Sequence, residues 1–160
     1  MIRRVYDDPA DLEARESMLY VSLLGGLALA NTKLGAVHGF AGALGGITGA
    51  SHGAICGTLL PYVTESNIRA LTNAKQEASL DRYTDIARWV TDKPDASHDA
   101  LIQWLYDVVA DLSIPSLGTL GLKETDIDAV VAQSQKSSSM KGNPITLSQD
   151  MLTSILQTAF

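Results

Sequence analysis

Two histidines and one cysteine are the residues of this sequence whose types and spacing could do chemistry. His38 and His52 lie in a stretch from Leu34 to Thr64 that contains no Asp, Glu, Lys or Arg. Neutral imidazoles are common ligands of divalent metal ions. On one straight helix, a separation of fourteen residues would place these two side chains about 21 Å apart. One ion can therefore bind both histidines only if the chain folds back between them.

Glycines between the histidines permit that fold-back. The uncharged stretch holds eight of the 13 glycines of the chain, and several of them lie between Gly42 and Gly49. We predict two short helical pieces with a turn around residues 45–49, which would allow His38 and His52 to share a metal ion. From the residues alone an alternative stays open, because a histidine in a Gly- and Ala-rich helix is also typical of a hydrogen-bonded core residue.

Other residues are weaker candidates for chemistry. Cys56 follows His52 by one helical turn and could face the same site, although we interpret it as a small buried hydrophobe. His98 is interpreted as a solvent-exposed residue without a role. A catalytic divalent metal needs three or four protein ligands, so two histidines leave a metal site incomplete. The sequence shows no P-loop and no nucleophile elbow, nor a dinucleotide fingerprint in its strand context.

Helical periodicity accounts for most of the chain. Asp8 and Pro9 predict the start of an apolar helix that runs from Leu12 to Ala30. Because this helix is apolar on most sides, we expect it to be central, with another backbone close to Gly25 and Gly26. The clearest amphipathic pattern follows a Ser97 N-cap. Further helices are expected over residues 80–90, after Thr125 and after Thr146, which has capping-box spacing with Gln149.

Three interpretations concern residues outside these patterns. Pro61 is expected to kink or restart a helix. Trp89 and Trp104 are expected in the core because they lie on apolar helical faces. The Ser-, Lys- and Gly-rich segment 133–143 is interpreted as a mobile linker. No alternating strand pattern occurs, so the predicted fold class is all-α: a compact bundle of about seven or eight helices in a single helical domain over residues 1–160.

Composition limits the functional classes. The chain has 160 residues, 46% of them hydrophobic, and a formal net charge of −6. These values exclude wholesale disorder and disfavour nucleic acid as a partner. A single cysteine rules out an intramolecular disulfide and suits a cytoplasmic location. The acidic N-terminal segment is not a secretory signal. We expect no membrane span either, because the histidines and hydroxyl side chains of the uncharged stretch would lack partners in lipid.

Several segments resemble the helical C-terminal half of the iron-containing alcohol dehydrogenases, and the similarity extends over essentially the whole chain. The segment from the first histidine to the second is the most specific. The matching segments are Ala14–Met18, Gly25–Asn31, Leu34–Ala41, Leu44–Gly46, Ser51–Ala54, Leu59–Val63, Ser113–Pro115, Leu120–Glu124 and Asn143–Pro144.

The resemblance implies an oxidoreductase that binds Fe(II), or sometimes Zn(II), between a helical domain and an N-terminal domain for NAD or NADP. It maps His38 and His52 onto two metal ligands of the family. Three features depart from the pattern: the two earlier family ligands have no counterpart here, the cofactor domain has none either, and Gly42 replaces a histidine found in many members. Ser51 also replaces a common proline.

We therefore expect a C-terminal helical domain with little dehydrogenase activity and weak metal affinity by itself. Its expected partner is the missing N-terminal domain, or a second copy bound through an exposed apolar face. Two alternatives remain: a non-catalytic helical interaction or scaffold module, and part of an enzyme that resembles maleylacetate reductase or glycerol dehydrogenase.

Overall fold

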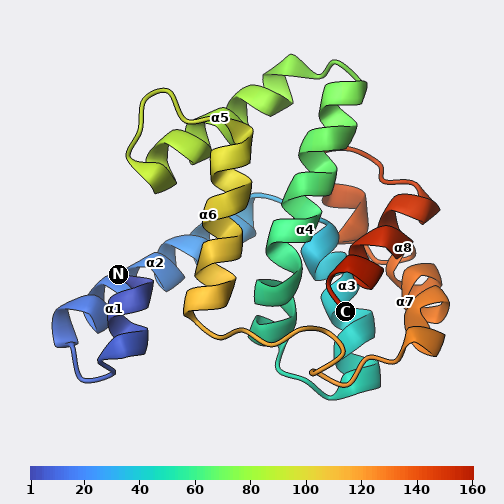
Figure 1. The fold of residues 1–160 in the computed structure, drawn as a ribbon, viewed down its shortest axis with the longest axis horizontal. Coiled ribbons are helices and arrows are strands. Elements are labelled where there is room, and N and C mark those ends of the chain that lie inside the picture. Colours follow the sequence, from blue (N-terminus) through green and yellow to red (C-terminus); the bar gives the residue numbers. More distant parts are fainter.

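A computed structural model describes all of residues 1–160 (Figure 1). The fold is all-α, as predicted, with eight α-helices, two short 3₁₀ turns and no strand. The α-helices are α1 (Ile2–Asp7), α2 (Leu12–Asn31), α3 (Ala36–Thr48), α4 (His52–Asn73), α5 (Glu77–Thr91), α6 (His98–Asp111), α7 (Ile127–Ser134) and α8 (Gln149–Thr158); the 3₁₀ turns are η1 (Glu124–Asp126) and η2 (Met140–Gly142).

The main core forms where α3 and α4 pack together and against α7 and α8. Eighteen buried residues make up this core, among them Phe40 and Leu44 of α3 and Ile55 and Leu59 of α4, all with no exposed surface. On the other side of α4, the pair α5–α6 packs through smaller apolar clusters. We call the part from α3 to α8 the body. Within it, α3 and α4 are fixed by burial on several sides.

A tight turn reverses the chain between α3 and α4. Gly49 has φ +67° and its backbone N–H donates to the carbonyl oxygen of Gly45, which ends α3. A left-handed conformation of this kind favours glycine because no Cβ is present. The predicted fold-back is therefore confirmed, and the turn lies at the end of the expected range.

The helix α4 continues through Pro61, so the expected restart is not observed. Pro61 is buried within α4, which runs without interruption from His52 to Asn73. Proline removes one backbone hydrogen bond from a helix. Burial of its ring in the core compensates for that loss, so packing overrides the local signal.

The helices α1 and α2 form an arm over residues 2–31, at the left of Figure 1. The predicted extent of α2 is confirmed, but its start signal is different. Asp8 and Pro9 lie in the turn after α1, and Asp11 caps α2 by accepting a hydrogen bond from the Ala14 backbone N–H at 3.0 Å. Asp11 is favoured because its carboxylate can reach that N–H, three residues ahead.

The expectation that α2 is a central helix is wrong for this chain. Ala14 is its only buried residue, and apart from the partly buried Met18 its large apolar side chains are 45–80% exposed. A Cβ added at Gly25 or Gly26 would meet no atom within 4 Å, so no backbone approaches there. Arg3 of α1 links the arm to α6 through an ion pair with Asp111 and lies 5.7 Å from the Trp104 ring centroid. Exposed ion pairs of this kind add little stability.

Four further expectations need correction. Trp89 is 77% exposed, and Trp104 is only half-buried. Segment 133–143 is packed rather than a free linker, because Met140 of η2 lies directly over Gly39. Ser148, not Thr146, caps α8 by accepting from the Met151 backbone N–H. The η1 turn precedes α7, which has no side-chain cap from Thr125.

Before α8 begins, Leu147 is buried in the core and Ile145 packs against it. None of the helices combines the length and apolar character that a bilayer span requires.

Candidate metal centre

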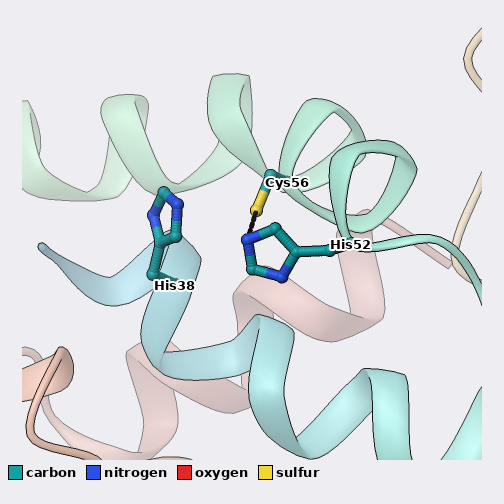
Figure 2. Close-up of side chains that lie close together, drawn as sticks. All are labelled: His38, His52 and Cys56. Atoms are coloured by element: carbon teal, nitrogen blue, oxygen red, sulfur yellow. Dashed lines mark hydrogen bonds between the residues drawn. The ribbon is translucent and has the colours of Figure 1, made fainter. Parts of the chain in front are cut away.

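The α3–α4 hairpin brings His38 and His52 together. His38 lies in the first turn of α3 and His52 is the first residue of α4. Their ring centroids are 5.2 Å apart and the ring planes are inclined by 49° (Figure 2). The predicted convergence of the two imidazoles is therefore confirmed. That they bind a metal stays a prediction.

Cys56 lies beside this pair. Its Sγ is 3.4 Å from Nε2 of His52, one helical turn earlier on α4 (Figure 2). The ligand atoms of His38, His52 and Cys56 all lie within 4.8 Å of one another. The thiol is half-buried rather than fully enclosed, so the interpretation as a buried hydrophobe misses its contact with the imidazole. In the sequence, the four-residue spacing between His52 and Cys56 indicated that the two side chains share a helix face.

Burial sets the protonation preferences of the site. It lowers the pKa of His38, and the neighbouring His52 lowers it further. His38 therefore favours the neutral imidazole, which is the form that binds metal ions. Burial also raises the pKa of the Cys56 thiol.

An asparagine pair that the sequence analysis did not assign to the site holds the start of α3. The backbone N–H of Ala36 donates to Oδ1 of Asn143 at 3.0 Å. Asn143 donates in turn to Oδ1 of Asn67 at 2.7 Å and to the Ile145 carbonyl oxygen at 2.8 Å. Because Gly35 has no side chain to cap the helix, Asn143 supplies the oxygen from elsewhere in the chain. The missing cap was the only local sign of this interaction.

A cavity of about 560 Å³ opens beside His38. His38 and Cys56 form part of its wall, and apolar residues of α4, α5 and α6 form much of the rest, including Leu60, Ile86 and Trp104. This size and lining suit a small organic ligand with an apolar part. Trp104 therefore has a role in the cavity wall rather than in the core.

His98 lies in a different environment. Its Nε2 is 2.9 Å from Oγ1 of Thr84 and 3.1 Å from the Leu80 carbonyl oxygen. It is half-buried between α5 and α6, so the expectation of a solvent-exposed side chain is wrong, although it takes no part in the His38–His52 cluster.

The donor set fits part of a site for Fe(II) or Zn(II). Two imidazole nitrogens are accepted by both ions, and a thiolate is accepted by zinc in particular. Nitrogen ligands sit about 2 Å from zinc, and the two rings are close enough for small side-chain rotations to reach such an arrangement. No carboxylate joins the cluster, so any further ligands must come from outside it.

Comparison with known proteins defines the class. Residues 1–160 match the Fe-containing alcohol dehydrogenase family, C-terminal. The chain therefore belongs to the iron-containing alcohol dehydrogenase family and corresponds to the C-terminal region of its members.

Individual relatives agree with this assignment. Alcohol dehydrogenase 4 of Schizosaccharomyces pombe is 34% identical over 159 residues, which are 99% of this chain and 36% of that protein. Maleylacetate reductase of Pseudomonas knackmussii is 30% identical, over 99% of this chain and 41% of that protein. A solved structure of 1,3-propanediol oxidoreductase superposes with a TM-score of 0.85 at 32% identity, over 99% of this chain and 41% of the other. The chain spans less than half the length of these relatives.

Proposed function

We propose that this chain is the metal-holding helical part of an iron-dependent, NAD(P)-linked oxidoreductase of the alcohol dehydrogenase type, with His38 and His52 as two of the metal ligands. The observation that carries the proposal is the approach of the two imidazoles to 5.2 Å beside an apolar cavity. Their positions on α3 and α4 follow from the core that fixes this hairpin.

When bound, Fe(II) or Zn(II) would act as a Lewis acid on an alcohol or carbonyl oxygen, and NAD or NADP would carry the hydride. The chain itself supplies the surroundings of that reaction. The imidazoles of His38 and His52 offer nitrogen donors, while the cavity wall excludes water around the apolar part of a small alcohol or aldehyde. Asn143 holds the first turn of α3 and thereby the position of His38.

We propose that the remaining ligands and the cofactor site come from outside this chain. The exposed leucines of α2 supply an apolar surface for that contact, and Leu12, Leu19 and Leu23 are 60–80% exposed. Apolar surface of this extent favours association. We propose that the N-terminal cofactor domain of the family covers it, or a second copy where that domain is absent. A cytoplasmic location fits the single cysteine.

A related reductase is the second candidate. Similarity to the maleylacetate reductase favours a reductase that uses the same site. The cavity and the histidine pair serve both candidates equally, so a comparison of substrate classes on the assembled enzyme separates them. Complete absence of metal binding in a folded chain would instead favour the scaffold alternative.

Metal binding by the chain tests the proposal. Calorimetric titration with Fe²⁺ under anaerobic conditions, and with Zn²⁺, should give equimolar binding to the unchanged protein. His38→Ala and His52→Ala should each weaken it by more than about 100-fold, which exceeds the effect of losing an outer-shell partner. His98→Gln is the matched control, because it removes an imidazole outside the site and should leave the affinity unchanged. Equal binding by the double variant His38→Ala/His52→Ala would contradict the proposal.

A further inference from the structure

We propose that a hollow between α4 and α8 binds a small oxyanion of the phosphate type, with Ser66, Arg69 and Ser154 as its hydrogen-bond donors. The inference goes beyond the proposed function, because none of the residues that line this hollow belongs to the histidine cluster. The ligand class is a phosphate group, either as the free ion or at the end of a monoester.

The hollow forms where α8 packs against α4, and it has a volume of about 80 Å³. One water molecule takes up about 30 Å³ of the liquid, so this space admits a single small ion. Residues three or four apart on a helix share one face. Ser66 and Arg69 therefore face the hollow together from α4, and Ser154 and Thr158 face it from α8.

The hydroxyl of Ser66 is the observation that points to a ligand. Ser66 is only 8% exposed, yet its side chain makes no hydrogen bond to another residue. Polar side chains that are buried to this extent usually have a partner in the protein or in ordered solvent. The one fully enclosed hydroxyl without a partner belongs to Ser134, so the Ser66 hydroxyl stays open to the hollow that it lines. An oxyanion bound there would accept its hydrogen bond.

Arg69 supplies the positive charge. The ion pairs of the chain use the arginines Arg3, Arg4 and Arg88, so no carboxylate is paired with the Arg69 guanidinium. A guanidinium presents several N–H donors in one plane, which match two oxygens of a phosphate group. A cation also suits the carboxyl end of a helix such as α8, and this structural role is the alternative that the experiment must separate.

Glu65 is the only acidic side chain in the wall of the hollow. Its Oε2 accepts a hydrogen bond from the Tyr106 hydroxyl of α6 at 3.0 Å. Burial, followed by the contact with Glu65, raises the pKa of Tyr106, so the phenol keeps its proton at neutral pH. Because α6 and α8 lie on opposite sides of α4 (Figure 1), this bond draws the carboxylate toward α6 and away from α8.

The two hydroxyls of α8 differ in what they can offer a ligand. Oγ1 of Thr158 donates to the Ser154 carbonyl oxygen at 2.8 Å, so its proton is already used. The Ser154 hydroxyl makes no such bond and can donate to an anion. Three donors from two helices, one of them charged, therefore line a space of the size of one oxyanion.

Phosphate titration of the chain tests this proposal. In an NMR titration at constant ionic strength, the Arg69 Nε–H and Ser66 backbone N–H signals should shift together and reach saturation. Arg69→Gln should weaken phosphate affinity by at least about tenfold, because it removes a charged donor, and Ser66→Ala by about three- to tenfold. Arg82→Gln is the matched control, since it removes an exposed arginine outside the hollow and should leave the affinity unchanged. Circular dichroism checks that each variant is folded.

Glycerol phosphate in the same titration distinguishes the two sources of the phosphate group. Tighter binding of glycerol phosphate than of inorganic phosphate assigns a monoester as the ligand, and equal or weaker binding assigns the free ion. Shifts that chloride reproduces at the same ionic strength, or equal losses of affinity in Arg69→Gln and Arg82→Gln, would overturn the proposal. A loss of stability in Arg69→Gln without any saturating phosphate shift would also overturn it, because Arg69 then only complements the end of α8.

Discussion

The arm and the body use apolar residues in opposite ways. In the body, Phe40 and Leu44 of α3 have no exposed surface, and the histidine pair lies at the edge of the core that they form. In the arm, α2 carries six leucines in 20 residues, yet Leu19 is 73% exposed and Leu23 is 60% exposed. Both helices have an apolar sequence, but only α3 finds its packing partners within these residues.

This contrast separates two meanings of an apolar helix. Burial of a large apolar side chain contributes roughly 1.5–3 kcal/mol to folding, and an exposed one contributes nothing until a partner covers it. The body therefore stabilises the hairpin that carries His38 and His52. The arm keeps exposed apolar surface that is available for association with a partner.

The largest expected difference is in core stability. Phe40→Ala should lower the free energy of unfolding by about 3–5 kcal/mol, because it leaves a cavity beneath α3. Leu23→Ala in the arm should change it by no more than about 0.5 kcal/mol, as at other exposed positions. Denaturant unfolding monitored by circular dichroism, at concentrations where the chain is monomeric, measures both. Comparable losses would show that α2 is packed as tightly as α3.

Helix caps provide a smaller and more local comparison. Ser148→Ala removes the cap of α8 in the body and should lower the free energy of unfolding by about 1 kcal/mol. Asp11→Ala removes the corresponding cap of α2 in the arm. It should leave the unfolding midpoint unchanged and speed amide hydrogen exchange only in the first turns of α2, because the arm opens without the body. A global shift on Asp11→Ala would contradict the separation of the two regions.

The smallest expected effect concerns proton binding at the histidine pair. Burial and then His52 lower the pKa of His38. In the metal-free chain, His52→Ala should therefore raise the pKa of His38 part of the way toward its usual value, since burial remains. Because the unfolded chain binds this proton more readily, the contribution of His38 to stability falls as the pH drops below about 6.5. NMR titration of the imidazole protons measures the change, and an unaltered His38 titration would show that the rings do not interact.

Local signals in the sequence were sufficient for much of the fold. Ser97 was predicted as a helix N-cap, and its side chain accepts a hydrogen bond from the Ala100 backbone N–H. The turn between the histidines followed from glycines, and Gly49 has the left-handed conformation that ends α3. Both features depend on neighbouring residues only, so spacing and residue type predict them. The convergence of His38 and His52 follows from that turn.

Contacts between segments that are far apart in the sequence could not be predicted from the spacing of residue types. Asn143 caps α3 from more than one hundred residues away, and nothing near Gly35 identifies it. The exposure of α2 depends on what packs against it, which an apolar pattern does not specify. Trp89 shows the same limit, because its helical position is compatible with either a buried or an exposed side chain.

A single NMR experiment tests most directly whether the two imidazoles share one metal ion. In a long-range proton–nitrogen spectrum of the histidine side chains, equimolar Zn²⁺ should shift the ring nitrogens of His38 and His52 together and leave His98 unchanged. Movement of only one of the two rings, or of neither, would contradict the account.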